Sequence, residues 1–335
     1  MTIPHLRWGI LGTGNIARKF AAGLRTIPHH CTVAAVGSRS ADSAQAFAQE
    51  HGGGCRAHAS YQALLDDPGV DVVYVSLLNH QHAEWSRRAA EAGKHVLCEK
   101  PATMTVAELE GVLAAVRRSG TFFMEGFLYR CHPRWDALRR SLADGVIGDL
   151  RLLHATFCFD GAGRDRLFTR ADGGGALMDV GCYPISWLRW IAGSEPVATA
   201  CVAQLNVDGV DLTASGELRF ANGVIGSFQT SVQSARLTTA LLHGTVGTIE
   251  ISEPWRGTAG LAAFIIRRDG RADETFTAPD DGLNTYAREA LNAATHLHHH
   301  ESPAMSWADS LGQARTMDAL RHQAGVRWDA ERNGS

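Results

Sequence analysis

The chain has 335 residues, of which 45% are hydrophobic, and its formal net charge is −3. That length and apolar content are enough for two packed domains. The near-neutral charge argues against nucleic-acid or anionic-membrane partners, and no apolar run approaches the roughly 20 residues that a membrane span needs.

The first 125 residues alternate short apolar runs with helix-like stretches. The apolar runs are continuous, as in strands buried on both faces, and strand–helix alternation predicts a parallel, doubly wound sheet. We therefore expect a Rossmann-type domain over residues 1–125. Its expected strands are 6–11, 32–38, 70–77, 95–98 and 121–124, and its expected helices are 15–27, 40–51, 81–93 and 105–120.

After about residue 130 the pattern changes to strands that alternate polar and apolar residues. Such strands predict an α+β domain, residues 126–335, with a large, mostly antiparallel and open-faced sheet that packs one face on helices. Asn222-Gly223 signals a hairpin turn, and we expect residues 329–335 to be frayed. The expected helices are 132–145, 182–192, 284–300 and 306–324, and the expected strands are 150–160, 196–205, 211–220, 224–232 and 261–269.

A glycine motif, 12-GTGNIA-17, follows the first strand and opens the first helix. In a dinucleotide site Gly12 permits a tight turn, Gly14 lets the backbone approach a pyrophosphate, and Ala17 keeps the helix close to the sheet. A plain glycine-rich strand–helix turn is the alternative. We expect Gly12, Thr13, Gly14, Asn15 and Ile16 to bind the cofactor.

The second strand ends in 37-GSRS-40, where an NAD site usually has an acidic residue for the ribose 2′-hydroxyl. A hydroxyl and a guanidinium suit a 2′-phosphate instead. Ser38 and Arg39 therefore predict a preference for NADP, with NAD possible. In the alternative, Arg39 is merely solvated and both coenzymes are used.

The tripeptide Glu99-Lys100-Pro101 follows the strand 95–98. The carboxyl ends of strands in a doubly wound sheet line the ligand crevice, so the Lys100 ammonium is expected near the nicotinamide. Pro101 fixes its own φ and restrains the preceding residue. A lysine that only extends its charge from a strand end into water is an equally simple interpretation.

The stretch 173-GGGALMDVGCYPISWL-188 leads a glycine-rich loop into a helix, where Asp179 and Tyr183 share a face. Asp179 could instead be an N-cap and Tyr183 a core aromatic. Hydride transfer at an alcohol carbon, however, needs a base for the hydroxyl proton. A nearby ammonium would lower the pKa of a tyrosine and suit it for that role.

At this point the chain resembles the glucose–fructose oxidoreductase / inositol dehydrogenase / MocA-like (Gfo/Idh/MocA) family over nearly its whole length. The tyrosine at 183 is similar to the branch that contains dimeric dihydrodiol dehydrogenase and NADP-dependent D-xylose 1-dehydrogenase. The matching segments are 12–17, 76-SLLNHQHAEW-85, 99-EKP-101, 124-MEGFLYRCHP-133, 173-GGGALMDVG-181 and 302–321.

The resemblance implies that Lys100 and Tyr183 are catalytic and that Asp179 orients the substrate. It places Arg166 with them at the substrate, and Leu77, Asn79, His82, Glu99 and Lys100 around the nicotinamide. It also implies that the C-terminal sheet builds the sugar pocket on one face and a dimer or tetramer interface on the other.

Two departures from the family pattern affect these expectations. The family usually has proline where this chain has Leu78, so the nicotinamide loop could lie differently. Relatives often read Arg-Leu-Asp-Pro where this chain has 166-RLFT-169, and that loop reaches substrate in them. The identity of the sugar is therefore open.

Histidines 80-HQH-82 and 296-HLHHH-300 suggest metal ligation, but the family needs no metal and we expect none. We expect Trp187 and Trp190 to lie in the core. Seven scattered cysteines without a CxxC pair, and no export signal at the N-terminus, favour a reducing cytoplasm.

Together these features predict a cytoplasmic, NADP-preferring dehydrogenase that acts on CH–OH donors. The substrate would be a small sugar or polyol, with C1 of an aldose such as xylose or glucose, giving a lactone, as the first choice. The alternatives are a reductase or dehydrogenase of a dicarbonyl sugar or a trans-dihydrodiol, and a non-catalytic NADP(H)-sensing regulator, which would be expected to lose Lys100 or Tyr183.

Overall fold

The computed structural model describes residues 3–51, 54–255, 263–278 and 281–332. The chain divides into two compact units, which we treat separately. Unit 1 comprises Met1–Cys131 with Leu283–Leu311, and unit 2 comprises His132–Gly282 with Gly312–Ser335. The predicted domains, 1–125 and 126–335, follow the change of sequence pattern, whereas the units follow contacts. Residues 283–311 join unit 1 because α8 (Thr285–His296) packs on α1 (Asn15–Leu24).

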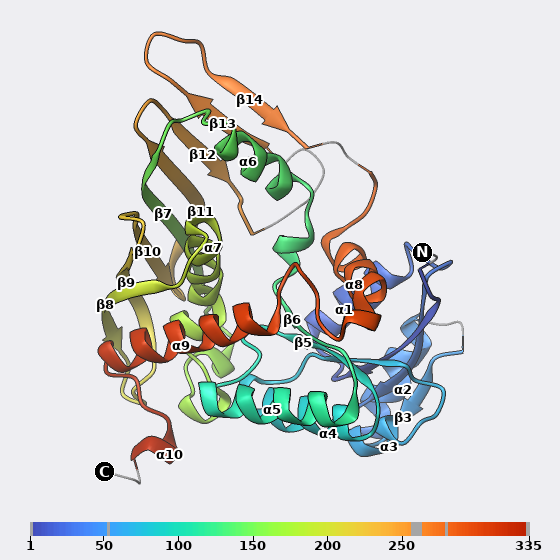
Figure 1. Cartoon of the computed structure of the whole chain (residues 1–335). Coiled ribbons are helices and arrows are strands. Elements are labelled where there is room, and N and C mark those ends of the chain that lie inside the picture. The colour runs from blue at the N-terminus through green and yellow to red at the C-terminus, as the bar shows by residue number, and fades with distance from the viewer. Residues whose placement is uncertain (1–2, 52–53, 256–262, 279–280, 333–335) are drawn as a thin grey trace. The chain divides into compact units, whose positions relative to one another are not determined.

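Unit 1 is built on a six-stranded parallel sheet in the order β3-β2-β1-β4-β5-β6, which is the predicted doubly wound Rossmann sheet. Helices α1 and α8 lie on one face, and α4 and α5 lie on the other (Figure 1). The strands are β1 (Leu6–Leu11), β2 (Cys31–Gly37), β3 (Arg56–His58), β4 (Val72–Val75), β5 (His95–Glu99) and β6 (Phe123–Gly126). The other helices are α2 (Ala41–His51), α3 (Tyr61–Leu65), α4 (Asn79–Glu91) and α5 (Val106–Ser119), with 3₁₀ turns η1 (Leu128–Cys131) and η5 (Leu297–His299).

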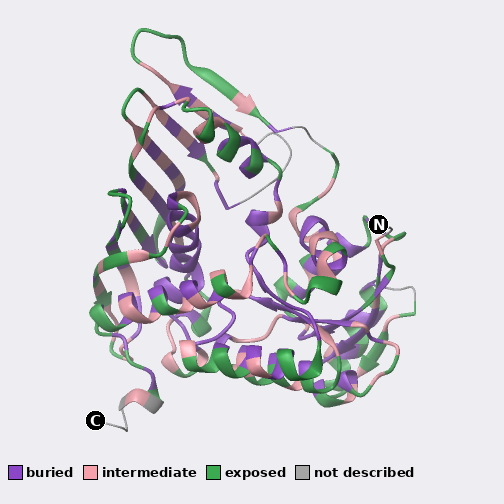
Figure 2. Ribbon diagram, viewed as in Figure 1, coloured by how far each residue is buried: buried purple, intermediate pink, exposed green. Residues whose placement is uncertain are grey.

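The central strands β1, β4, β5 and β6 are buried along nearly their whole length, whereas the edge strand β3 is not (Figure 2). The core behind them is aromatic: Phe20 of α1 stacks on Tyr74 of β4 with ring centroids 3.8 Å apart, and its edge meets Trp8 of β1. A sheet buried on both faces explains why the sequence shows continuous apolar runs here.

Unit 2 contains an eight-stranded sheet in the order β14-β13-β12-β11-β7-β10-β9-β8, antiparallel except for the pair β7–β10. This confirms the predicted mostly antiparallel sheet. Its strands are β7 (Leu150–Asp160), β8 (Pro196–Leu205), β9 (Asp211–Phe220), β10 (Ile225–Ser231), β11 (Gln233–Gly244), β12 (Thr248–Ser252), β13 (Ala263–Arg267) and β14 (Glu274–Thr277). Its helices are α6 (Arg134–Ala143), a π-helical turn η4 (Leu177–Gly181), α7 (Cys182–Ala192) and α10 (Asp329–Arg332), with 3₁₀ turns η2 (Asp165–Leu167) and η3 (Arg170–Asp172).

One face of the unit 2 sheet packs against η4 and α7, which puts residues such as Leu218 and Phe228 in the core. Residues that alternate with these are exposed, among them Val202 at 73% and Leu237 at 51%. The hairpin predicted at Asn222-Gly223 joins β9 to β10, with Gly223 at φ +84°. Trp187 is fully buried against Trp135, as predicted.

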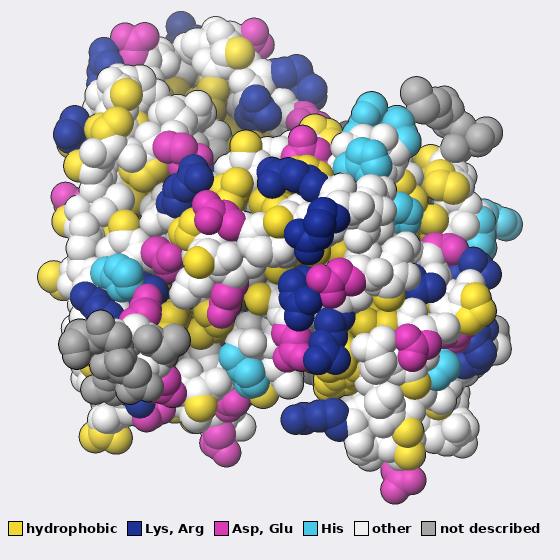
Figure 3. All heavy atoms as spheres, turned by 60° about the horizontal axis from the view of Figure 1, so that its bottom comes forward, with side chains coloured by type: hydrophobic (Ala, Val, Ile, Leu, Met, Phe, Trp, Pro, Cys, Tyr) yellow, Lys and Arg dark blue, Asp and Glu magenta, His cyan; other side chains and the backbone are white. Residues whose placement is uncertain are grey.

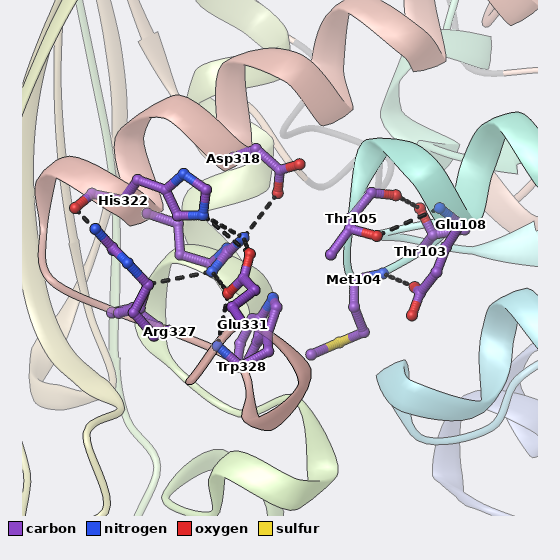
Figure 4. A network of polar contacts seen from close by, with 11 residues as sticks. Thr103, Met104, Thr105, Glu108, Asp318, His322, Arg327, Trp328 and Glu331 are labelled. Carbon is purple, nitrogen blue, oxygen red and sulfur yellow. Dashed lines mark hydrogen bonds and ion pairs between the residues drawn. The ribbon is translucent and has the colours of Figure 1, made fainter. Parts of the chain in front are cut away.

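The C-terminal segment is more ordered than the sequence indicates. Residues 329–332 form α10, and Glu331 binds His322 and the buried guanidinium of Arg321 on α9 (Trp307–Gln323) (Figure 4). The backbone N–H of Trp328 also donates to Glu331. The expectation of a frayed tail is therefore wrong for residues 329–332, because the buried Arg321 holds this segment. Residues 333–335 lie outside the described residues. So do residues 261 and 262 of the strand predicted at 261–269.

In the view of Figure 3, acidic and basic side chains are interspersed over most of the surface, and several Lys and Arg side chains gather near the middle of this face. In the part of the chain that the structure describes, no helix has both the length and the apolar character needed to cross a membrane.

Candidate active site

The turn between β1 and α1 has the two properties that a phosphate-binding loop needs. Gly12 has φ +97°, and a Cβ there would lie 3.0 Å from the Ser76 carbonyl oxygen, so only glycine fits. Gly14 is the N-cap of α1, and a Cβ there would meet nothing within 4 Å. The first glycine therefore tightens the turn, and the second leaves open space in front of the helix.

The start of α1 fits a pyrophosphate. No side chain caps it and its first turn carries no acidic residue, so the N–H groups from Asn15 onward face a site that favours an anion. Ile16 is 38% exposed and Ala17 is fully buried against the sheet, as the motif predicts. The Thr13 carbonyl accepts a hydrogen bond from Arg18, which also donates to Glu50.

The carboxyl end of β2, the strand beside β1, carries Ser38 and Arg39. Ser38 is 8% exposed, and its hydroxyl oxygen accepts a hydrogen bond from the Ser40 N–H at 3.3 Å. Arg39 is exposed. Its guanidinium is therefore accessible to an anionic ligand at this edge of the sheet.

The loop after β4 keeps the backbone that proline would impose, although it lacks the proline of the family. Leu78 is the N-cap of α4 with φ −74° and ψ 149°, which lies within the range of proline. Asn79 begins the helix and is 9% exposed. Leu77 is half-buried, and its side chain lies 3.3 Å from a Cβ placed on Gly12.

His82 points inward from α4 and joins two loops. It is 1% exposed; its Nδ1 lies 2.8 Å from the Pro101 carbonyl oxygen and its Nε2 lies 3.1 Å from that of Leu77. Burial lowers the pKa of His82 to about 4, so the ring is neutral at pH 7 and donates its one proton to one of these two carbonyl oxygens. The histidine therefore holds the loops after β4 and β5 together.

The end of β5 is held by its own glutamate. The Lys100 N–H donates to Glu99 Oε2 at 3.3 Å, and the Tyr74 hydroxyl donates to Glu99 Oε1. Glu99 is 8% exposed, Lys100 is half-buried, and the Lys100–Pro101 peptide bond is cis. The carboxylate thus lies behind the strand end and supports the backbone of the lysine.

Two buried acids near this strand end were missed from the sequence. Glu125 of β6 is 2% exposed and accepts the Ala102 N–H at 3.0 Å; burial raises the pKa of Glu125 to about 7. Glu289 of α8 is fully buried, and burial together with the charge of Glu99 raises its pKa well above the usual range. A charged residue inside the apolar run 121-TFFMEGF-127 was a signal that could have identified Glu125.

In unit 2, the glycine run 173–175 is packed against its own chain. A Cβ on Gly174 would lie 2.6 Å from the Leu167 carbonyl oxygen, and one on Gly175, which has φ +113°, would lie 2.3 Å from Asp211 Oδ1. The Gly175 N–H donates to the Leu167 carbonyl oxygen at 2.9 Å. These glycines therefore let the loop that carries Arg166 pack closely against the start of the helix.

Arg166 and Asp179 form an ion pair with Nη1 and Oδ1 3.0 Å apart. Asp179 lies inside the π-helical turn η4 and is 9% exposed, so the alternative that it is a helix N-cap is wrong. Pro184 has no N–H to close an α-helical turn onto the Val180 carbonyl, which is consistent with wider winding here.

Tyr183 follows Asp179 by four residues and lies among aromatic rings. Its ring centroid is 5.5 Å from that of Phe157 and 5.9 Å from that of Trp255, and the residue is 9% exposed. Rings at these separations fix the phenol orientation. The helix segment thus presents a paired carboxylate and a positioned phenol.

Asp211, at the start of β9, supports this helix and was also missed from the sequence. Its Oδ2 accepts the Leu177 N–H at 2.7 Å, at the beginning of η4, and it is 1% exposed. Burial raises the pKa of Asp211 to about 7. A single acid before a strand has no periodic signature, so no sequence pattern separates it from a surface aspartate.

The structure brings the predicted site residues together as two sets. In unit 1, the carboxyl ends of β1, β2, β4 and β5 carry Gly12, Thr13, Gly14, Asn15, Ile16, Ser38, Arg39, Leu77, Asn79, His82, Glu99 and Lys100. In unit 2, η2, η4 and α7 carry Arg166, Asp179 and Tyr183. The joint action of Lys100 and Tyr183 stays a prediction.

Three histidines of the run 296–300 contact one another or the backbone. His298 and His299 are in ring contact, with centroids 3.8 Å apart, and His300 Nδ1 lies 3.2 Å from the Thr121 carbonyl oxygen. Within the described ranges, no group of three or more His, Cys, Asp or Glu side chains is arranged to hold a metal ion.

Comparison with known proteins gives matches over both parts of the chain. Residues 6–127 match the model described as "Oxidoreductase family, NAD-binding Rossmann fold", and residues 135–250 match the GFO/IDH/MocA C-terminal domain. Trans-1,2-dihydrobenzene-1,2-diol dehydrogenase of Mus musculus is 38% identical over 76% of each chain, and that of Sus scrofa is 32% identical over 98% of this chain and 99% of the relative.

A solved structure supports the same assignment. KijD10, a 3-ketoreductase from Actinomadura kijaniata in complex with NADP and TDP-benzene, superposes with a TM-score of 0.87 at 30% identity, covering 96% of this chain and 98% of that one. The predicted fold and the nicotinamide class of cofactor are confirmed. The chain belongs to the Gfo/Idh/MocA family of oxidoreductases, with an NAD-binding Rossmann domain at its N-terminal end.

Proposed function

We propose that this protein is an NADP-preferring dehydrogenase that transfers hydride between the nicotinamide and a hydroxyl-bearing carbon of a ring-shaped sugar or diol. The observation that carries the proposal is the arrangement on unit 2: Tyr183 lies one helical turn from an Asp179 that is paired with Arg166 at 3.0 Å. A phenol and a carboxylate so spaced suit adjacent hydroxyls of one substrate.

The nicotinamide, when bound, supplies or accepts the hydride. The protein's part in oxidation is to remove the hydroxyl proton, and we assign that step to the Tyr183 hydroxyl as its phenolate. We assign to Lys100, at the end of β5, the second part in this chemistry, because a positive charge stabilises a phenolate. In reduction the same phenol returns the proton to the new alkoxide.

The remaining groups bind and orient. Asp179 is positioned to accept a hydrogen bond from a substrate hydroxyl, and its ion pair with Arg166 orients its carboxylate. Phe157 and Trp255 flank Tyr183 and offer apolar faces to a ring. This combination of aromatic faces with one ion pair is expected for a cyclic, uncharged polyhydroxyl substrate.

For the substrate, C1 of an aldose such as xylose or glucose, oxidised to a lactone, is the first candidate. A trans-dihydrodiol is the second, because several relatives that are 30–38% identical carry that activity in their names. Both contain a ring with adjacent hydroxyls. The preference for NADP is supported by Ser38 and the exposed Arg39 where an NAD site usually has an acid.

The test is a dehydrogenase screen over aldoses and trans-dihydrodiols with NADP⁺ and NAD⁺, followed by absorbance of the reduced nicotinamide. Turnover of at least one of the two classes, faster with NADP⁺, is expected. Equal rates with both coenzymes would remove the inference from Ser38 and Arg39, and no turnover of either class would remove the substrate proposal.

Two variants test the chemistry. Lys100→Met and Tyr183→Phe should each lower kcat by roughly 10²–10⁴-fold, because each removes part of the proton acceptor, while NADP(H) binding persists. Binding is measured by quenching of protein fluorescence. Wild-type kcat in either variant would refute the role of that residue, whereas NADP(H) binding without turnover of any substrate in the wild type would favour a non-catalytic use of the bound cofactor.

A further inference from the structure

The turn Lys100–Ala102 is held through its backbone by three side chains from three elements of unit 1. The Lys100 N–H donates to Glu99 at 3.3 Å, the Pro101 carbonyl faces His82 Nδ1 at 2.8 Å, and the Ala102 N–H donates to Glu125 at 3.0 Å. All three side chains are titratable and at most 8% exposed. The position of the proposed catalytic lysine therefore depends on buried side chains that are not proposed to take part in the proton transfer.

Glu125 is distinguished among the three by its surroundings. It lies in β6, the strand next to β5, and its Oε1 accepts the Ala102 N–H, while the Ser310 hydroxyl of α9 lies near enough to stabilise its ionised form. Behind it, Arg130 of η1 forms an ion pair with Asp309 of α9. One carboxylate thus links the turn of the lysine to a charge pair.

We propose that Glu125 is a positioning residue for Lys100: its ionised carboxylate fixes the Ala102 N–H and thereby the turn that carries the Lys100 ammonium. This inference rests on the role of Lys100 in the proposed function and adds to it. Glu125 itself is buried and is not assigned contact with substrate or cofactor.

The burial of Glu125 makes its hydrogen bond with the Ala102 N–H sensitive to pH near neutrality. Burial raises its pKa to about 7, against the opposing effects of the Ala102 N–H, Ser310 and Arg130; Asp309 acts in the same direction as burial. Cys98 of β5 is paired with Glu125 across the parallel ladder, and burial raises the pKa of Cys98.

The sign of the effect follows from the acceptor strength. Below about pH 7 Glu125 is neutral and its bond to Ala102 is weak; above that pH it is ionised and the bond is charge-assisted. A charge-assisted bond is roughly twice as strong as a neutral one, so we expect kcat to rise about tenfold through this range as the turn is fixed.

Glu125→Gln is the sharpest test, because the amide oxygen still accepts the Ala102 N–H but cannot ionise. Its kcat between pH 5.5 and 8.5 should lack the rise near pH 7 and stay at the level of the acidic wild type. The KM for the coenzyme should change much less than kcat. Glu110→Gln, on the exposed side of α5, is the matched control and should keep the wild-type profile.

Ser310→Ala tests the same group without touching it. Because the Ser310 hydroxyl lowers the pKa of Glu125, its removal should move the rise in kcat to higher pH. A wild-type profile in Glu125→Gln, or an unmoved rise in Ser310→Ala, would overturn the proposal. A purely structural role would lower stability in these variants and leave the position of the rise unchanged.

Amide hydrogen exchange separates this proposal from the proposed function, since it needs no substrate. After correction for intrinsic exchange, protection of the Ala102 amide should increase from pH 6 to pH 8 in the wild type and stay constant in Glu125→Gln. Equal protection in both proteins at both pH values would refute the role of Glu125 even if the enzyme is active. The expected difference would support it even if no aldose or dihydrodiol is a substrate.

Discussion

Two glycine-rich turns lead into helices in this molecule, and they have opposite physical reasons for their glycines. In unit 1, Gly14 stands before open space at the uncapped start of α1. In unit 2, a Cβ on Gly174 would lie 2.6 Å from a backbone oxygen and a Cβ on Gly175 would lie 2.3 Å from a carboxylate oxygen of the same chain. The first turn leaves room for a ligand, whereas the second leaves room for its own protein.

The difference teaches that a glycine cluster does not by itself identify a phosphate site. Both turns precede a helix, and only the surroundings of the missing Cβ distinguish them. In unit 2 the close packing brings η2 to the helix, so Arg166 can pair with Asp179. The glycines there shape a polar pair instead of binding an anion.

Among the substitutions that test this comparison, Gly175→Ala is expected to have the largest effect, a loss of folding free energy. The new Cβ would lie 2.3 Å from Asp211 Oδ1, and the alanine would have to adopt φ +113°. We therefore expect a loss of at least about 3 kcal/mol of folding free energy. Gly193→Ala, at φ +69° with no atom within 4 Å, is the control and should lose only about 1–2 kcal/mol. Denaturant titration measures both, and equal losses would mean that Asp211 yields freely.

The sequence predicted the fold best where strands are buried on both faces of the sheet. The strands of unit 1 are continuous apolar runs, and all five that were expected are present. The longest strand of unit 2, β11 (Gln233–Gly244), was missed because 233-QSAR-236 is polar and exposed. Strand β11 is stabilised by backbone hydrogen bonds to β7, and backbone hydrogen bonds do not depend on the pattern of polar and apolar side chains.

The candidate site shows the same division. Lys100 and Gly12 could be predicted because strand ends and glycine spacing are local signals. The apolar run around Glu125 signals a buried acid, but neither its partner nor that of Asp211 could be predicted, because the N–H groups of Ala102 and Leu177 lie 23 and 34 residues away. Such long-range backbone contacts are known only once the chain has folded.

A second prediction tests the open turn. Gly14→Ala should change folding free energy by less than about 1 kcal/mol, because Gly14 has φ −72° and its Cβ would meet no atom. The methyl group would occupy the space that a pyrophosphate needs, so we expect the Kd for NADP(H) to rise roughly 30-fold, or about 2 kcal/mol.

Gly111→Ala on α5 is its matched control, since Gly111 is also free of close neighbours. It should stabilise the helix by about 1 kcal/mol and leave the Kd unchanged. Unaltered NADP(H) binding in Gly14→Ala would show that the first turn is, like the second, only a structural turn.

The arginine beside the packed turn gives a third, smaller effect. Arg166→Ala removes the ion pair with Asp179, and we expect the substrate KM to rise about tenfold, as for loss of one hydrogen bond to a charged group. Stability should change by less than about 1 kcal/mol, because the Arg166 side chain is 43% exposed. Arg151→Ala, from an exposed pair of the same unit, should affect neither quantity; a KM unchanged in Arg166→Ala would exclude Arg166 from the substrate site.

The arginine beside the open turn should give the smallest effect, and one that depends on coenzyme and salt. Arg39 is exposed, so its attraction for a 2′-phosphate is worth about 1 kcal/mol, or fivefold in the KM for NADP⁺ at low salt. Arg39→Ala should lose that factor for NADP⁺, keep its KM for NAD⁺, and converge with the wild type as ionic strength rises. Arg25→Ala, exposed at the far end of α1, controls for general charge. If Arg39→Ala raises the KM for NADP⁺ and the KM for NAD⁺ alike, Arg39 binds a part that both coenzymes share, such as the pyrophosphate. It would then not bind the 2′-phosphate of the ribose.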